Sequence, residues 1–159
     1  VLYERTDLVD HVIGTVRNGR TSTADFGWGA VESTIEIGPE FAAGLTGLDQ
    51  FSHVIVLFHM HQDPDHEPPA LTRRPRGRAD MPLIGVFAQR GRMRPNPLGI
   101  TVSEVVRVEP GRLVVRGLDA VEGTPVLDLK PYVPVFDRRD DARAPEWMDR
   151  LMAGYFAEE

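Results

Sequence analysis

The residues best suited to hold a charged ligand lie in one short stretch, 85–101, which reads GVFAQRGRMRPNPLGIT. Arg90, Arg92 and Arg94 stand in or beside a loop that Pro95 and Pro97 stiffen, because each proline fixes its own backbone torsion and restricts the residue before it. A guanidinium group pairs with carboxylates and phosphates through a planar fork of donors. The stretch therefore predicts a loop whose donors are already in place for a polar or anionic ligand.

Charge is unevenly distributed along the chain, and its distribution favours a local anion site. The formal net charge is -6, which argues against holding nucleic acid by overall electrostatics. Between Arg73 and Arg94, however, seven arginines stand against one carboxylate, Asp80, and the only lysine of the chain is Lys130. Arginine in place of lysine suits phosphate or carboxylate recognition. A solvated arginine-rich loop without a ligand is the alternative interpretation.

Two histidines end the most apolar strand of the sequence, SHVIVLFHMH at 52–61. Because side chains alternate along a strand, His59 and His61 share a face with His53, while the opposite face is wholly apolar. With further acidic and imidazole groups at 63, 65 and 66, this His-x-His pair is one possible start of a metal site. The alternative is a strand-end histidine that bonds to the backbone or faces a ligand cleft.

A long loop follows these histidines. Residues 62–80, QDPDHEPPALTRRPRGRAD, contain four prolines and are acidic in the first half and basic in the second. A loop of this length inside a compact domain is usually functional or disordered. For an RNA partner, the basic half is the expected contact, with arginines on phosphates.

Two further groups offer binding chemistry, each with two interpretations. Trp28, between Gly27 and Gly29, either covers the core from a turn-rich loop or presents an indole face to a base or a cation. Asp128 and Lys130 stand two apart on one face of a strand, so they either form a mutual ion pair or hold polar groups of a ligand.

The elements that must position these groups are mostly short strands. The pattern predicts few helices, and an apolar stripe in the last one indicates a core or dimer contact. Gly and Pro turns between short strands predict an all-β barrel or sandwich, and no G-x-G-x-x-G follows a strand, which disfavours a Rossmann-type fold. Strands are expected at 9–17, 31–37, 52–61, 85–89, 99–108, 112–117 and 126–130, and helices at 39–47 and 145–157.

Length and composition set the outer bounds. A chain of 159 residues with 42% hydrophobic content predicts one domain. Zero cysteines exclude disulfides, thiolate metal sites and cysteine nucleophiles. No apolar run reaches the length of a membrane span, and the first residues do not follow the signal-peptide pattern, so a cytoplasmic protein is expected.

Three blocks of the sequence together resemble a known family, the TrmO (TsaA-like) tRNA methyltransferases. The blocks are GLDQFSHVIVLFHMHQ at 47–62, GVFAQRGRMRPNPLGIT at 85–101 and LDAVEGTPVLDLKPYVP at 118–134. Their order and spacing make the resemblance more specific than one proline-rich loop would. The chain is similar to a short form of the family, without the C-terminal domain of longer members. The resemblance implies a single TsaA-like β-barrel methyltransferase domain over residues 1–159.

This resemblance carries expectations about fold, partners and site. It implies a compact, mostly β barrel with short peripheral helices and a C-terminal helix, paired as a homodimer with S-adenosyl-L-methionine bound close to the subunit interface. The implied acceptor is the N6 nitrogen of threonylcarbamoyladenosine beside the anticodon of tRNA. Carried over by position, the implied cofactor-binding residues are Trp28, Gly29, His61, Gln62, Arg90, Arg94, Pro95, Asn96, Leu98, Thr101, Leu127, Asp128, Leu129 and Lys130.

Methyl transfer to this acceptor is an in-line displacement at a sulfonium, so positioning is the main task of the enzyme. Asp128 or His61 is expected to take the proton of the acceptor nitrogen, with Tyr132 presented to the same pocket. The arginines of the stiff loop would serve the carboxylate of the donor, or the carboxylate and phosphates of the acceptor. The alternatives are a non-catalytic S-adenosylmethionine or nucleotide-binding module, a methyltransferase for another small acceptor, and a metal-dependent hydrolase using His59, His61 and Asp63.

Overall fold

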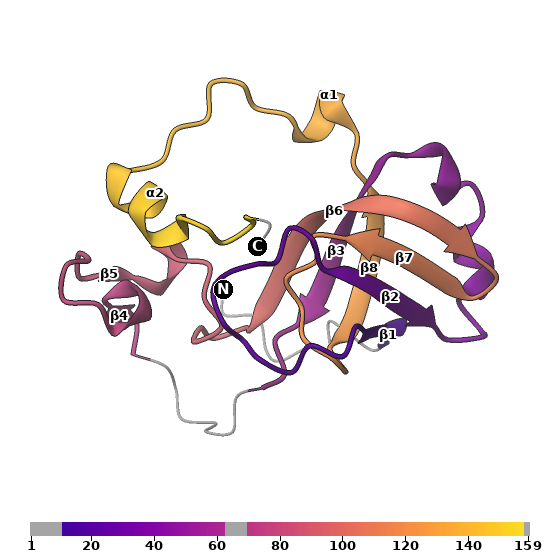
Figure 1. The fold of residues 1–159 in the computed structure, drawn as a ribbon, viewed down its shortest axis with the longest axis horizontal. Helices are drawn as coiled ribbons and strands as arrows, with labels where there is room; N and C mark the ends of the chain where they lie inside the picture. The colour runs from indigo at the N-terminus through magenta and orange to yellow at the C-terminus, as the bar shows by residue number, and fades with distance from the viewer. Residues whose placement is uncertain (1–10, 63–69, 158–159) are drawn as a thin grey trace, which may run out of the picture.

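A closed antiparallel β-barrel of six strands is the main feature of the computed structural model, which describes residues 11–62 and 70–157 (Figure 1). Around the barrel the strand order is β1-β2-β7-β6-β3-β8, so every strand is paired on both sides. The predicted β-barrel class is confirmed. The strands are β1 (Gly14–Arg17), β2 (Glu32–Ile37), β3 (His53–His59), β6 (Leu98–Glu109), β7 (Arg112–Arg116) and β8 (Pro125–Pro131).

The core fills the inside of this barrel by the alternation that the sequence predicted. On β3, Val54, Val56 and Phe58 are buried, while the residues between them face outward and are half-buried. Gly99 of β6 lies under the ring of Phe58, where an ideal Cβ would be 2.3 Å from two ring carbons. The absence of a side chain at Gly99 therefore lets the aromatic ring pack directly on the neighbouring strand.

A second, smaller unit stands beside the barrel and was not predicted. It is a two-stranded ribbon of β4 (Thr72–Arg73) and β5 (Ile84–Gly85), next to the helix α2 (Glu146–Met152) (Figure 1). The prediction of one long loop over 62–80 was therefore incomplete, because this span holds β4 and a short 3-10 helix, η3 (Pro75–Gly77). Residues 63–69 lie outside the described residues.

The buried strand predicted at 85–89 is wrong. After β5 the chain turns into a 3-10 helix, η4 (Val86–Ala88), in which Val86 is buried and Phe87 is 81% exposed. A strand of five residues needs backbone partners along its edges, and β5 pairs with β4 over two residues only. Periodicity cannot separate a short buried strand from a short helical turn in an apolar run of this length.

The helices are shorter than the pattern predicted. The segment 39–47 contains only the 3-10 turn η1 (Ala42–Leu45), and η2 (Leu48–Gln50) follows it. The C-terminal helix α2 ends at Met152, before Gly154 with its φ of 76°, so it does not reach Ala157. One turn of helix, α1 (Pro134–Asp137), was not predicted. In the part of the chain that is described, no helix is long and apolar enough to cross a membrane.

The remaining strand predictions are close to the observed bounds. The hairpin of β6 and β7 turns at Gly111, whose φ is 69°, and β8 extends one residue beyond the predicted strand on each side. The first strand begins at Gly14, later than the predicted start at 9, although residues 1–10 are not described. In β2 the predicted faces are correct, with Ser33, Ile35 and Ile37 buried.

Antiparallel pairing brings four connecting segments to one end of the barrel. These are the segments after β1, after β3, before β6 and after β7. Arg76 of the ribbon forms an ion pair of 2.8 Å with Asp25 in the first of them. The backbone N–H of Trp28 donates to the carbonyl of Tyr155 at 3.0 Å, so the C-terminal segment joins the same end.

Candidate functional site

The stiff loop between β5 and β6 holds its three arginines against the backbone. Each of Arg90, Arg92 and Arg94 donates one guanidinium N–H to a carbonyl oxygen. A guanidinium group has five N–H donors, so each keeps others for a ligand. The acceptors are the carbonyls of Ile100 for Arg90 at 2.7 Å, Gln62 for Arg92 at 2.9 Å and Gln89 for Arg94 at 3.0 Å.

This loop is seated on the end of β3, where the predicted histidines lie. The backbone N–H of Met60 donates to the carbonyl of Pro97 at 2.8 Å, and His59 pairs with Leu98. His61 is partly buried, and its Nδ1 is buried without a hydrogen-bond partner in the described structure. A buried ring nitrogen without a partner is costly unless a ligand completes it. The structure thus brings together His61, Gln62 and the arginine loop.

Arg73, which was not predicted as a site residue, lies against the same loop. Its Nη2 is 2.8 Å from the position of an ideal Cβ on Gly91. Burial lowers the pKa of the Arg73 guanidinium, and repulsion from Arg92 and Arg94 lowers it further. The ribbon places Arg73 here, because β4 pairs with β5 immediately before the loop. Only the count of arginines in the sequence pointed toward this residue.

Asp128 and Lys130 form an ion pair on the outer face of the barrel. Lys130 Nζ is 2.7 Å from Asp128 Oδ2, and Asp128 Oδ1 accepts the backbone N–H of Leu129 at 2.9 Å. The hydrogen bond to Asp128 raises the pKa of Lys130. Asp128 pairs with Leu57 on β3, so its side chain shares the outward face of that strand. The mutual ion-pair interpretation agrees with this geometry.

The three predicted catalytic residues do not meet within one chain. Tyr132 lies beside His53 at the start of β3, with its N–H on the carbonyl of His53 at 3.0 Å and the two rings 6.2 Å apart. His61 follows the far end of β3. His61 is eight positions after His53, which corresponds to roughly 25 Å along an extended chain. Asp128 lies between these two ends, opposite Leu57.

Trp28 and Gly29 are part of the packing between the first loop and the C-terminal segment. Trp28 is 3% exposed, the guanidinium of Arg20 lies 3.7 Å from the centre of its ring, and its Nε1 donates to the carbonyl of Ala24 at 3.0 Å. An ideal Cβ on Gly29 would be 2.0 Å from the carbonyl oxygen of Phe156. This arrangement favours the core-covering interpretation of Trp28 over an open platform for a ligand.

Thr101 leads to a polar cluster that sequence reasoning missed. Its hydroxyl donates to one carboxylate oxygen of Asp119, and the hydroxyl of Tyr155 donates to the other at 2.9 Å. Burial, followed by the nearby charge of Asp119, raises the pKa of Tyr155. Thr101 is buried and its hydroxyl is bonded to Asp119, so it is not exposed to a ligand in this structure. The sequence indicated only a turn at Asp119.

The other predicted contacts divide between the loop and the barrel wall. Pro95 and Asn96 are exposed on the loop, and the carbonyl of Asn96 accepts the N–H of Leu98 at 2.7 Å. Leu129 packs against the barrel core, and Leu127 lies where the pairing of β8 with β3 shifts register. The loop residues are therefore available to a ligand, whereas Leu129 serves the core.

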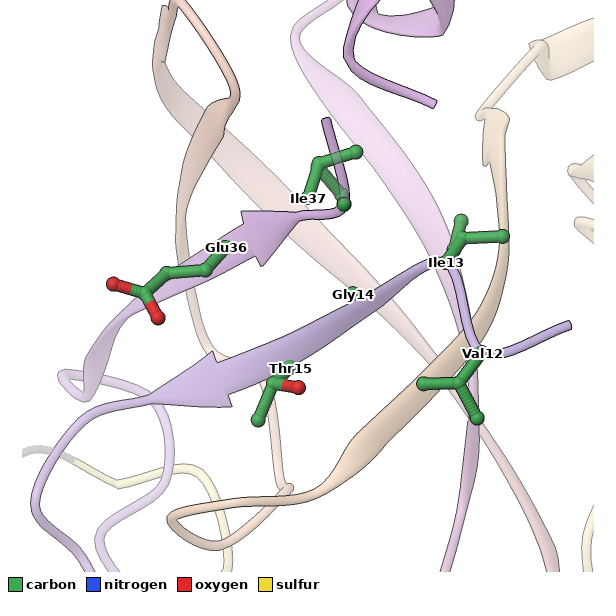
Figure 2. A pocket seen from close by; sticks show the side chains of 7 residues that line it. Val12, Ile13, Gly14, Thr15, Glu36 and Ile37 are labelled. Carbon is green, nitrogen blue, oxygen red and sulfur yellow. The ribbon is translucent and has the colours of Figure 1, made fainter. Parts of the chain in front are cut away.

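The site residues do not line the open hollow beside β1 and β2. This hollow of about 290 Å³ is lined by Val12, Ile13, Gly14, Thr15, Glu36, Ile37 and Gly38 of β1, β2 and the residues beside them, and Figure 2 shows mainly aliphatic side chains around it. Among residues 11–62 and 70–157, no group of three His, Asp or Glu side chains is placed to hold a metal ion. Asp63, Asp65 and His66 lie outside the described residues.

Comparisons with known proteins agree with one another. A family model described as the tRNA-methyltransferase O N-terminal domain matches residues 23–138. An S-adenosyl-L-methionine-binding protein from Archaeoglobus fulgidus is 40% identical over 125 residues, which cover 76% of this chain and 78% of that protein. The crystal structure of TrmO from Pseudomonas aeruginosa superposes with a TM-score of 0.73 at 34% identity, covering 92% of this chain and 64% of that one.

Several relatives are longer than this chain. The tRNA (adenine(37)-N6)-methyltransferase of Homo sapiens is 39% identical over 101 residues, which are 64% of this chain and 22% of that protein. The chain spans 62% of the length of a curated relative from Pyrococcus abyssi and 48% of one from Pseudomonas aeruginosa, at 39% and 44% identity.

Proposed function

Because the chain belongs to the family of the tRNA-methyltransferase O N-terminal domain, we propose that it is an S-adenosylmethionine-dependent methyltransferase that acts on tRNA. The observation that carries this proposal is the seating of the proline-stiffened arginine loop on the end of β3, next to the unpartnered ring nitrogen of His61. We take residues 1–159 to be one such domain and the cytoplasm, where tRNA is available, to be its location.

The residues of this end of the barrel fit the proposed donor. Arg90 has guanidinium donors beyond the one bonded to a carbonyl, which suits the carboxylate of the donor, and Arg94 likewise keeps donors for a second anionic group. Gln62, Pro95 and Asn96 are exposed beside them and offer amide groups and an apolar ring edge to a nucleoside. S-adenosylmethionine, when bound, supplies a methyl group on a sulfonium. Prolines and hydrogen bonds to backbone carbonyls already restrain this loop, so little conformational entropy is lost when a ligand binds.

The proposed acceptor is the N6 nitrogen of threonylcarbamoyladenosine in tRNA. This nitrogen forms a bond to the methyl carbon while the carbon–sulfur bond breaks, and the proton of the nitrogen passes to a base on the protein. We assign that role to His61, since its Nδ1 has no hydrogen-bond partner among the described residues, whereas Asp128 is already paired with Lys130. Tyr132 and Asp128 would have to come from a second subunit to share this site.

A homodimer through the outer face of β3 and β6 is the second part of the proposal. Three neighbouring outward side chains of β6, Leu98, Ile100 and Val102, are 46%, 49% and 47% exposed, and β3 sets Ile55 and Leu57 beside them. A contiguous apolar face of this kind indicates a protein contact. The Asp128–Lys130 pair lies on the same outer face, so pairing there would bring Asp128 of each subunit to the interface.

The test is methyl transfer itself. The purified protein is incubated with S-adenosylmethionine carrying a heavy methyl group and with tRNA that contains threonylcarbamoyladenosine, and the nucleosides are analysed by mass spectrometry. We expect one labelled methyl group on N6 of that nucleoside. Calorimetric binding of S-adenosylmethionine without any methylated product would instead indicate the non-catalytic binding module. A labelled methyl group on another acceptor would replace the proposed substrate.

The role of His61 is tested with His61→Gln. We expect the rate of transfer to fall by about 10²–10⁴-fold, since a positioned base contributes that much, while S-adenosylmethionine affinity changes little. The matched control is His11→Gln, which changes an exposed histidine that lies against Phe41. If His61→Gln transfers methyl groups at the wild-type rate, His61 is not the base, and we would assign that role to Asp128.

A further inference from the structure

Arg73 occupies a position that folding alone does not favour. Its Nε is buried and has no hydrogen-bond partner in the described structure, and its Nη2 is pressed toward the backbone of Gly91. Its backbone carbonyl accepts from the side-chain amide of Gln89 at 3.1 Å. A buried guanidinium nitrogen without an acceptor is costly unless a ligand completes it.

The charges around Arg73 add to this cost. Its own burial, and after it the repulsion from the nearby charges of Arg92 and Arg94, holds the pKa of Arg73 below its usual value. Within the described residues, the ion pairs of the neighbouring ribbon are made by Arg76 with Asp25 and by Arg78 with Asp80, and none involves Arg73, Arg92 or Arg94. Like charges that lie near one another, with no carboxylate of the described residues paired to them, can accept an anion.

Arg90 does not belong to this cluster. Its Nη2 donates to the carbonyl of Ile100 on β6, toward the barrel, whereas Arg92 and Arg94 are anchored to Gln62 and Gln89. The hydrogen bonds thus separate Arg90, which is held on β6, from Arg92 and Arg94, whose charges are close enough to Arg73 to lower its pKa. The ribbon that carries Arg73 stands beside the barrel (Figure 1).

The position and overall charge favour a phosphate of a polymer over a small anion. The ribbon stands outside the barrel, so its face can be reached by a large partner (Figure 1). With a net charge of -6, the chain needs a local cluster of guanidinium groups to hold RNA. Contacts to phosphate fix the register of a nucleic acid on a protein without reading its sequence, which is the task that a methyltransferase must solve for one adenosine.

We propose that Arg73, Arg92 and Arg94 form an anion site that takes one phosphodiester group of the RNA substrate and so positions the acceptor nucleoside. This inference rests on the proposed function, since RNA is the substrate proposed there. Arg90 is left to the methyl donor, so the two sets of arginines have separate ligands.

The experiment measures binding of a tRNA transcript to the wild type and to Arg73→Gln between 50 and 200 mM salt, by fluorescence anisotropy. Removing one phosphate contact should reduce the slope of log affinity against log salt by about 0.7–0.9 and weaken binding several-fold at the lowest salt. S-adenosylmethionine affinity, measured by calorimetry without RNA, should not change. The melting temperature should stay the same or rise, because a repelled and desolvated charge is removed.

Arg112→Gln is the matched control, since Arg112 is an exposed arginine of β7 whose nearest recorded carboxylate, on Glu36, is 4.0 Å away. For this control, the slope of log RNA affinity against log salt should equal that of the wild type. An unchanged slope in Arg73→Gln would overturn the inference, and so would a loss of S-adenosylmethionine affinity with the RNA slope intact. A lower melting temperature would show that Arg73 pairs with a carboxylate of its own chain. If the wild type methylates tRNA but Arg73→Gln has the same salt dependence of RNA binding as the wild type, only this inference fails. If the wild type neither binds nor methylates tRNA, the proposed function fails first.

Discussion

Tyr155 shows how a single side chain can hold the C-terminal segment on the barrel. The sequence placed it on the apolar stripe of a helix, together with Trp147 and Leu151, four residues apart. In the structure the helix has already ended, and the Tyr155 hydroxyl reaches Asp119, which also accepts from Thr101. The C-terminal segment is thereby tied to β6 and to the segment after β7.

We predict that Tyr155→Phe lowers the free energy of unfolding by about 1.5–3 kcal/mol, the usual contribution of a hydrogen bond to a charged group. The pKa of Tyr155 is raised in the folded state, so this side chain contributes stability that is complete below the ordinary tyrosine pKa, near 10. That contribution is lost as the pH rises toward the folded pKa. The difference between wild type and variant, measured by urea unfolding, should therefore shrink above about pH 10. A difference that stays constant into strong alkali would contradict the assignment.

At the scale of elements, Glu122 joins the segment after β7 to the segment after β1. Its carboxylate accepts the backbone N–H groups of Gly19 at 2.8 Å and Asn18 at 2.7 Å, and Arg17 Nη1 at 3.1 Å. The bond from Gly19, followed by those from Asn18 and Arg17, lowers the pKa of Glu122. This carboxylate thus stabilises the loop end of the barrel in its ionised form.

We predict that Glu122→Gln lowers the melting temperature at pH 7. A lowered pKa means that the stability is present above the ordinary glutamate pKa and is lost as the pH falls through the folded value. The variant and the wild type should therefore converge in acid, in a series of melting curves from pH 7 to pH 3. Glu40→Gln, at an exposed position after β2, is the control and should follow the wild type throughout. Equal melting temperatures of Glu122→Gln and wild type at pH 7 would contradict the role of this carboxylate.

The contact of β6 with β3 depends on Gly99. An added Cβ would meet the ring of Phe58 at 2.3 Å, and the ring is enclosed in the core. We predict that Gly99→Ala destabilises the fold by about 1–3 kcal/mol, the usual cost of overpacking. Gly44→Ala is the control, because no atom lies within 4 Å of its added Cβ. Denaturant unfolding measures the stability of both variants. If Gly99→Ala unfolds at the same denaturant concentration as Gly44→Ala, the ring of Phe58 moves aside without cost.

At the scale of the whole molecule, the proposed homodimer makes a prediction about mass. Ile100→Glu places a charge in the middle of the outer apolar face of β6, where it should prevent association. Light scattering after size exclusion should give a dimer for the wild type and a monomer for the variant. Val135→Glu, on the exposed side of α1, should remain a dimer. A monomeric wild type at the same concentration would refute the pairing.

Much of the barrel followed from local pattern, since its strands carry alternating or continuous apolar residues between turn residues. The faces of β2 and β3 and the β6–β7 hairpin were predicted from this alternation. The order β1-β2-β7-β6-β3-β8 was not, because it depends on contacts between residues far apart in the chain. The ribbon was missed for the same reason: two-residue strands have no period to detect.

The candidate site divides in the same way. The stiffness of the loop and its arginines were visible in the sequence, because proline and guanidinium act through their own geometry. Which carbonyl each arginine bonds to, and the position of Arg73 against the loop, were decided by the pairing of β4 with β5 and by acceptors up to 30 positions away. The separation of Tyr132 from His61 likewise follows from antiparallel pairing, which sets neighbours in space by strand direction and not by closeness in sequence.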